Sequence, residues 1–207
     1  MKKILIFFLF ILIIGVNFSS DGGEVKKENG VWNFVTVDKK SKNLYREIPF
    51  GSNKEYVKKH LNEDFNYEDE STLGYESKIL NIPSEAYFKF NKDKFWRVEF
   101  NSKAIHYTAK YWFKDYKTVK NVITQKYGAP SKDMEMYENV FYRNNPDYSL
   151  ENGFLTLYTI WNLENIRIVI TMGTYNEKIH MNIYYDSKEF LDKNLKNMYV
   201  YDFIDIN

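Results

Sequence analysis

Three apolar runs near the carboxyl terminus lie so close together that they restrict the possible folds of this chain. They cover residues 154–161, 166–172 and 179–185, and all three have the length of a β-strand. The segments between them have hairpin length, whereas a parallel crossover needs a dozen or more residues. The sequence therefore predicts an antiparallel meander in this region.

The first half of the chain predicts a helix followed by further strands. Ser52 and Glu55 form a capping box, and the apolar spacing behind it predicts a short helix over residues 53–61. Between residues 73 and 100 apolar and polar side chains alternate, with a hairpin turn expected at residues 91–94.

A second helix is expected directly after the clearest alternation in the chain. Residues 105–113 alternate as a strand does, with Trp112 on the face opposite Tyr107. Helical spacing then begins after Asp115, a plausible N-cap residue, and Gly128 marks its end. Another capping box, Asp186 with Glu189, predicts a third helix after the meander.

This order of elements predicts an α+β fold with antiparallel meanders and short helices. Nothing alternates as β-α-β, which argues against a doubly wound parallel sheet. The helix-then-strands pattern occurs twice, in residues 44–113 and in residues 114–207, and this predicts two tandem α+β units. Both a single domain with a shared sheet and two separate domains fit this pattern.

The amino terminus predicts export from the cytoplasm. Two lysines precede the apolar run 4–14, which is too short to span a bilayer, and small polar residues follow it. We expect a signal peptide at residues 1–22, followed by a leader and a first strand at residues 23–43. An uncleaved membrane anchor is the alternative. We therefore expect an extracytoplasmic protein, periplasmic or secreted, that meets the membrane only through this segment.

The segment Phe50–Leu61 (FGSNKEYVKKHL) resembles the opening of small BamE/SmpA-type envelope proteins, in which such a helix precedes a meander. The helix exit Gly128-Ala129-Pro130 is similar to theirs, and tandem copies of such a module resemble the β-lactamase inhibitor protein fold. The chain departs from this family in having no lipid-anchor cysteine. The resemblance implies a non-catalytic envelope module that binds proteins.

Composition excludes several functions. The chain has 29 basic and 28 acidic side chains, without the basic excess of a nucleic-acid binder. The absence of cysteine excludes a disulfide scaffold, a cysteine nucleophile and cysteine-ligated zinc or iron–sulfur sites. The three histidines have no metal-binding spacing, and the acidic loop 62–71 lacks the glycine and the closing carboxylate of a calcium loop. We find no nucleophile or phosphate-binding motif, and we expect no enzymatic activity, metal or cofactor.

Aromatic residues make up 18% of the chain, the most unusual feature of its composition. Tyrosine and tryptophan serve both in cores and in binding surfaces. We predict that Trp96, Trp112 and Trp161 form an exposed aromatic surface on a sheet that binds a protein partner in the cell envelope. The same rings are expected to stack on sugars if the ligand is a cell-wall glycan, and a carboxylate-based extracellular hydrolase is a third hypothesis.

Overall fold

The computed structural model describes residues 44–194 of the chain. The signal peptide expected at residues 1–22 and the leader and strand expected at residues 23–43 lie outside the described residues.

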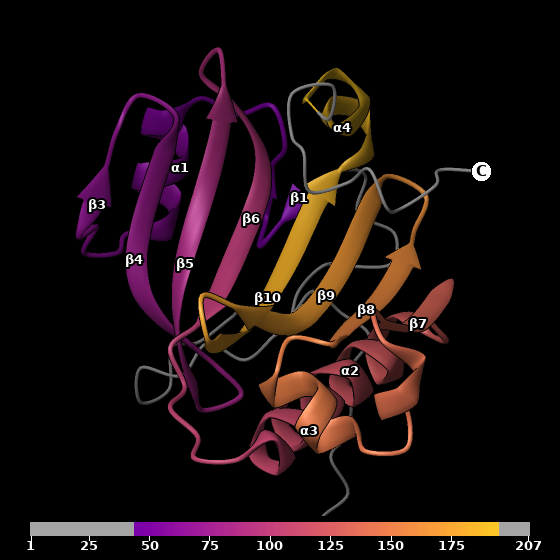
Figure 1. Cartoon of the computed structure of the whole chain (residues 1–207). Helices are drawn as coiled ribbons and strands as arrows, with labels where there is room; N and C mark the ends of the chain where they lie inside the picture. Colours follow the sequence, from indigo (N-terminus) through magenta and orange to yellow (C-terminus); the bar gives the residue numbers. More distant parts are fainter. Residues whose placement is uncertain (1–43, 195–207) are drawn as a thin grey trace, which may run out of the picture.

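An antiparallel sheet of eight strands forms the centre of the molecule (Figure 1). In chain order its strands are β3 (Tyr67–Glu68), β4 (Thr72–Ile79), β5 (Ile82–Asn91), β6 (Lys94–Ser102), β7 (Lys132–Tyr137), β8 (Leu155–Asn162), β9 (Ile166–Tyr175) and β10 (Lys178–Ser187). In space they follow the order β3-β4-β5-β6-β10-β9-β8-β7. Two further strands, β1 (Leu44–Tyr45) and β2 (Ile48–Pro49), pair with each other.

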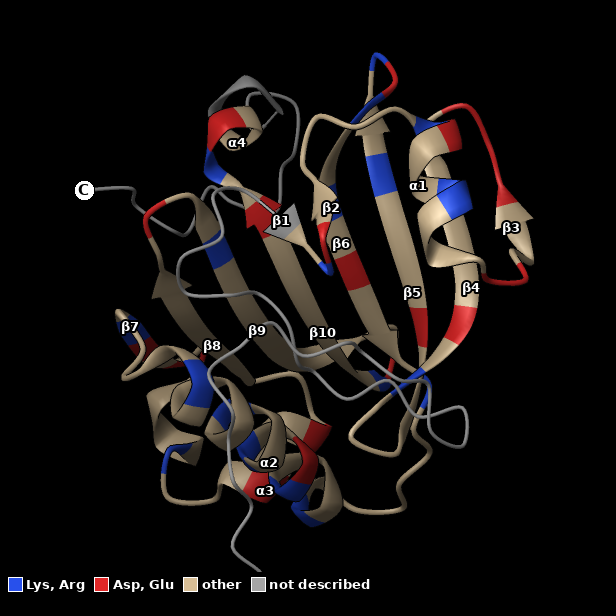
Figure 2. Ribbon diagram, turned by 180° about the vertical axis from the view of Figure 1, so that it is seen from behind, with Lys and Arg blue, Asp and Glu red and all other residues tan. Residues whose placement is uncertain are grey.

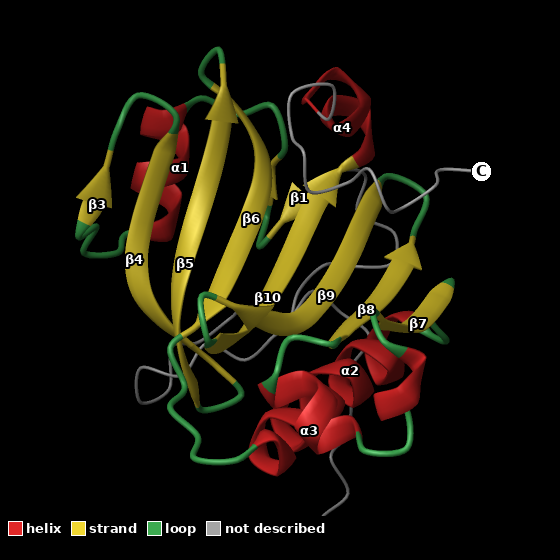
Figure 3. Ribbon diagram, in the orientation of Figure 1, coloured by secondary structure: helices red, strands yellow, loops and turns green. Residues whose placement is uncertain are grey.

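Helices of different length accompany the sheet (Figure 3). They are α1 (Lys54–Leu61), α2 (Ala109–Tyr127), the 3₁₀-helix η1 (Val140–Tyr142), α3 (Pro146–Glu151) and α4 (Lys188–Asn194). The predicted α+β class with antiparallel meanders is confirmed. The element order also repeats, because α1 precedes β3 to β6, α2 precedes β7 to β10, and β6 pairs with β10 in the middle of the sheet.

Both α1 and α2 cover the same face of the sheet. One row of buried side chains crosses five neighbouring strands in register, and every member of it belongs to the hydrophobic core that also contains buried residues of both helices: Phe88, Val98, Tyr185, Ile168 and Trp161. Figure 2 shows α1 in front of β4 and β5, whereas Figure 1 shows these strands from their other side. Because side chains alternate along a strand, the neighbouring row faces away from the helices.

The strand expected over residues 105–113 is wrong, because α2 already begins at Ala109, with Thr108 as its N-cap residue in place of Asp115. Aromatic and apolar side chains occur on both sides of this segment, so that it fits a period of two as well as the helical period. The buried positions of the helix, Ala109, Trp112 and Tyr116, follow the helical spacing of three to four residues.

Both predicted capping boxes are also wrong in detail. The N-cap of α1 is Asn53, whose side chain accepts a hydrogen bond from the backbone N–H of Tyr56, in place of Ser52. Asp186 belongs to β10 and is fully buried in an ion cluster, so it does not cap α4. Short polar side chains before a helix have several possible partners, and the tertiary structure selects among them.

Candidate functional site

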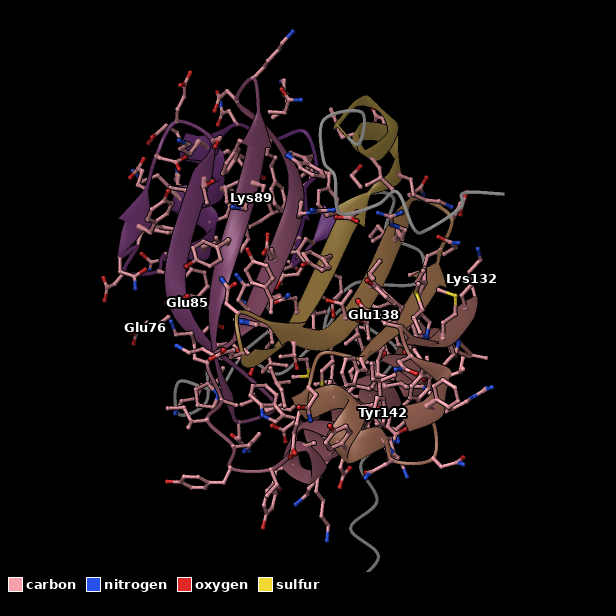
Figure 4. All side chains as sticks on the ribbon, viewed as in Figure 1. Glu76, Glu85, Lys89, Lys132, Glu138 and Tyr142 are labelled. Carbon is pink, nitrogen blue, oxygen red and sulfur yellow. The ribbon has the colours of Figure 1, made fainter. Side chains whose placement is uncertain are left out.

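We call the sheet face that neither α1 nor α2 covers the open face. Its side chains on β5 and β6 include Glu85, Tyr87, Lys89 and Glu99, all partly exposed. Figure 4 shows Glu85 and Lys89 along β5, in the view in which α1 lies behind the sheet. Successive side chains alternate between the open face and the core face, since Tyr87 lies opposite Glu99 while Phe88 lies opposite Val98.

Tyr87 is a partly exposed aromatic ring of this face, on β5. Its hydroxyl donates a hydrogen bond of 2.9 Å to Glu85, and Lys89 Nζ lies 5.2 Å from the centre of its ring. Burial raises the pKa of the Tyr87 phenol to about 12, and the hydrogen bond to Glu85 contributes further to the rise. The ring therefore stays neutral and offers a rigid surface with a polar tip, which suits recognition.

Gly74 on the neighbouring strand β4 makes room for this ring. A Cβ atom at Gly74 would lie 2.9 Å from ring carbons of Tyr87 and 3.2 Å from the Cβ of Tyr67. Tyr67 meets Tyr87 edge to face, with 6.0 Å between ring centres. The glycine thus allows two aromatic rings to lie together at this edge of the sheet, the arrangement known as aromatic rescue of an edge glycine.

Ion pairs fix the charged side chains around Tyr87. Lys103 Nζ donates to Glu85 at 3.0 Å. Burial acts to raise the pKa of Glu85, but the hydrogen bonds from Lys103 and Tyr87 outweigh it and hold the pKa below its ordinary value. Glu85 is therefore ionised at neutral pH, and this part of the open face carries both signs of charge.

A buried ion cluster lies on the open face where the two halves of the sheet meet. Across β6, β10 and β9, the side chains of Arg97, Asp186 and Arg167 form a buried cluster. Asp186 accepts hydrogen bonds from Arg97 Nε at 2.6 Å and from Arg167 Nη2 at 3.0 Å. Val169 and Ile160 on the same face are also buried. Tyr184, Asn182, Thr171 and Tyr158 stay partly exposed, so the open face continues across β10, β9 and β8 beside this cluster.

The structure buries all three tryptophans that we expected to be exposed. Trp96, Trp112 and Trp161 are only 6%, 5% and 1% exposed, respectively. Trp112 belongs to α2 and Trp161 to the core row, where its indole Nε1 donates to the backbone oxygen of Gly128 at 3.0 Å. The prediction of an exposed tryptophan surface is therefore wrong, and the three rings do not lie together on one face.

Sequence reasoning missed Tyr87, although a signal for it was present. Ala86, Phe88 and Phe90 alternate as an apolar set, so the residues between them must face the other side of the sheet. Alternation alone does not tell which of the two faces the helices cover, so the sequence leaves the exposure of Tyr87 open.

Exposed apolar side chains also occur before α2, in η1 and at the end of β9. Tyr107, Phe141 and Ile105 are 97%, 89% and 86% exposed, respectively. The backbone N–H of Ala109 donates to Glu151 at the end of α3, which places the two helix ends side by side. We call these exposed residues the apolar end; they are Ile105, Tyr107, Val140, Phe141 and Tyr175.

Two of the three histidines contact partners close to them in the sequence. His60 Nδ1 contacts the backbone oxygen of Tyr56, and His106 Nε2 contacts Asp115 at 2.7 Å, so these two histidines have separate local partners. Within residues 44–194, no group of three or more histidine, aspartate or glutamate side chains could hold a metal ion. Among the same residues, no helix is both long and apolar enough to cross a membrane.

No protein-family model, curated protein or solved structure matches this chain. The resemblance to BamE/SmpA-type proteins and to the β-lactamase inhibitor protein fold therefore stays a prediction from the sequence motifs.

Proposed function

We propose that this protein is an exported, non-catalytic binding protein that holds a protein partner against the open face of its sheet. One observation carries the proposal: both α1 and α2 cover the same face, so the open face carries an aromatic and charged surface on β4, β5 and β6. The apolar amino-terminal run supports export, and the sequence resemblance supports a protein-binding envelope module.

The chemistry of the open face supports a protein as the ligand. Tyr87 and Tyr67 supply amphipathic rings, and Glu85, Lys89 and Glu99 surround them with both signs of charge. Protein interfaces typically combine such aromatic anchors with a polar rim. Strands hold these side chains more firmly than loops do, so little conformational entropy is lost when a partner binds.

The experiment compares two surfaces of the same protein. The full chain is expressed with an affinity tag, purified as the host processes it, and used to capture proteins from an envelope extract of the source organism. The variant Tyr87→Ala with Lys89→Ala alters the open face, whereas Tyr107→Ala with Phe141→Ala alters the apolar end and serves as the matched control.

We expect one enriched protein that untagged bait displaces and that the open-face variant captures at least tenfold less well. Loss of capture in the apolar-end variant alone would move the binding site to that end. Enrichment of glycan without protein would favour the carbohydrate hypothesis. Both variants must unfold cooperatively at the temperature of the wild type, so that loss of binding reflects the surface and not the fold.

A further inference from the structure

Strand β4 has a free edge along its second half. On its outer side β4 pairs only with the two-residue strand β3, through Leu73 and Gly74 (Figure 1). On its inner side it pairs with β5 along its whole length, from Thr72 to Ile79. Within residues 44–194, no strand pairs with the outer edge of β4 beyond Gly74.

The hairpin geometry shows which backbone groups this edge presents. Leu80 and Asn81, with φ of 48° and 69°, form the two-residue turn that joins β4 to β5 and closes with the pair Ile79 and Ile82. Hydrogen-bonded and non-hydrogen-bonded residue pairs alternate along an antiparallel ladder, so the backbone of Ser77, like that of Ile79, forms hydrogen bonds with β5. Glu76 and Lys78 therefore direct their N–H and C=O groups outward, away from β5.

Side chains at this edge are also incompletely paired. Ser77 is buried, and its Oγ has no hydrogen-bond partner. A hollow of about 320 Å³ adjoins it, lined by residues of β4, β5 and the segment after β6: Glu76, Ser77, Lys78, Pro83, Ser84, Glu85 and Lys103. Buried hydroxyl groups normally have a partner, so a hydroxyl brought alongside Ser77 would satisfy its Oγ.

We propose that a second copy of this chain occupies this edge and that the two β4 strands pair antiparallel about a twofold axis at Ser77. Glu76 of each copy then lies opposite Lys78 of the other, and the two outward-facing backbone pairs supply four hydrogen bonds. The two Ser77 side chains meet at the axis, where each hydroxyl finds a partner. The result is a single sheet that runs through both molecules.

The charge pattern selects this register. If the twofold axis moved to Glu76, the two Glu76 side chains would lie opposite each other and repel. If it moved to Lys78, the two Lys78 side chains would do the same. A shift by one residue turns every side chain to the wrong face of the sheet. Charges on an edge strand usually prevent pairing, but here they are complementary to a second copy of themselves. The inference does not depend on the proposed partner of the open face.

Charge reversal tests the proposal by sedimentation equilibrium of the full chain as the host processes it. We expect the wild type to dimerise with concentration, and Glu76→Lys and Lys78→Glu each to weaken the dimer roughly tenfold, since each creates two like-charge pairs. The double variant Glu76→Lys with Lys78→Glu should dimerise as the wild type does. A mixture of the two single variants should form the heterodimer in preference to either homodimer, which misfolding cannot imitate.

A cysteine at the axis provides a second, independent measurement. The native chain has no cysteine, so Ser77→Cys introduces a single thiol in each molecule. Non-bonded antiparallel pairs have Cα atoms about 4.5 Å apart, within the range that a disulfide spans. We expect mild oxidation to convert Ser77→Cys to a covalent dimer, while the exposed control Ser71→Cys stays largely monomeric. A wild type that is monomeric at every concentration, a dimer insensitive to both charge reversals, or equal cross-linking of the two cysteines would overturn the proposal.

Discussion

The carboxylate of Asp186 accepts a hydrogen bond of 2.6 Å from Arg97, the residue directly opposite it across the β6–β10 seam. Arg167 lies opposite Asp186 on the other side, in β9, and donates a second bond of 3.0 Å. All three side chains are buried, so one carboxylate joins the two halves of the sheet at the point where they meet.

Removal of this carboxylate should strongly destabilise the fold. Asp186→Asn keeps the size of the side chain but takes the negative charge from two buried guanidinium groups, and breaking a buried ion pair in this way costs about 3–5 kcal/mol. Urea unfolding, followed by circular dichroism, measures the loss. The control Glu85→Gln, which breaks the more exposed pair with Lys103, should cost less than about 1 kcal/mol. Equal losses in the two variants would show that the seam does not depend on Asp186.

The Asp186 cluster also shows why the sequence predicts strands but does not predict side-chain contacts between residues far apart in the chain. The meander of β8, β9 and β10 was predictable because short connections and alternating side chains are local features. Arg97 and Asp186 are 89 positions apart, and only the register of the folded sheet brings them together. A capping box and a buried ion cluster therefore looked the same at Asp186 in the sequence.

The binding surface was mispredicted for a related physical reason. Aromatic residues alternate with other side chains on both faces, and the sequence does not state which face the helices cover. Residues 109–113 of the expected strand belong to α2, which buries Trp112 and removes one ring of the expected surface. Trp161 does lie on a strand, as predicted, but its side chain faces the side of the sheet that the helices cover.

Substitution of a buried tryptophan should therefore act on stability. Trp161→Ala leaves a large cavity in the core row and removes the hydrogen bond to Gly128, with an expected loss of about 3–5 kcal/mol in the free energy of unfolding. Phe141→Ala, at an exposed position, should change it by no more than about 0.5 kcal/mol. Chemical denaturation of both variants makes the comparison. A stable Trp161→Ala variant would contradict its place in the core.

Acid should loosen the turn between β3 and β4 through Asp69. Tyr67 donates to Asp69 at 2.5 Å and the backbone of Ser71 donates at 2.7 Å, and these bonds hold the pKa of the carboxyl at about 2. Because the folded pKa lies below the unfolded one, this contribution to stability is present above about pH 4 and is lost as the pH falls toward 2. NMR titration of the Asp69 carboxyl measures it directly. Tyr67→Phe should raise this pKa, and an unchanged pKa in that variant would contradict the role of the hydroxyl.

Gly74→Ala should disturb the centre of the proposed binding surface. The added methyl group would lie 2.9 Å from the ring of Tyr87, so the ring must move, and overpacking of this kind costs about 1–3 kcal/mol. In a Tyr87→Ala background the ring is absent, and Gly74→Ala should then cost clearly less. The four proteins of this double-mutant cycle are compared by urea unfolding.

The same cycle separates binding from stability. If the open face holds the partner, Gly74→Ala should weaken capture because Tyr87 is displaced, while it adds nothing to the loss already caused by Tyr87→Ala. The apolar-end variant Phe141→Ala serves as the control, since it changes neither ring nor sheet edge. An additive effect of Gly74→Ala and Tyr87→Ala on stability would show that the glycine does not act through the ring, and that its small size serves some other contact, such as that with Tyr67.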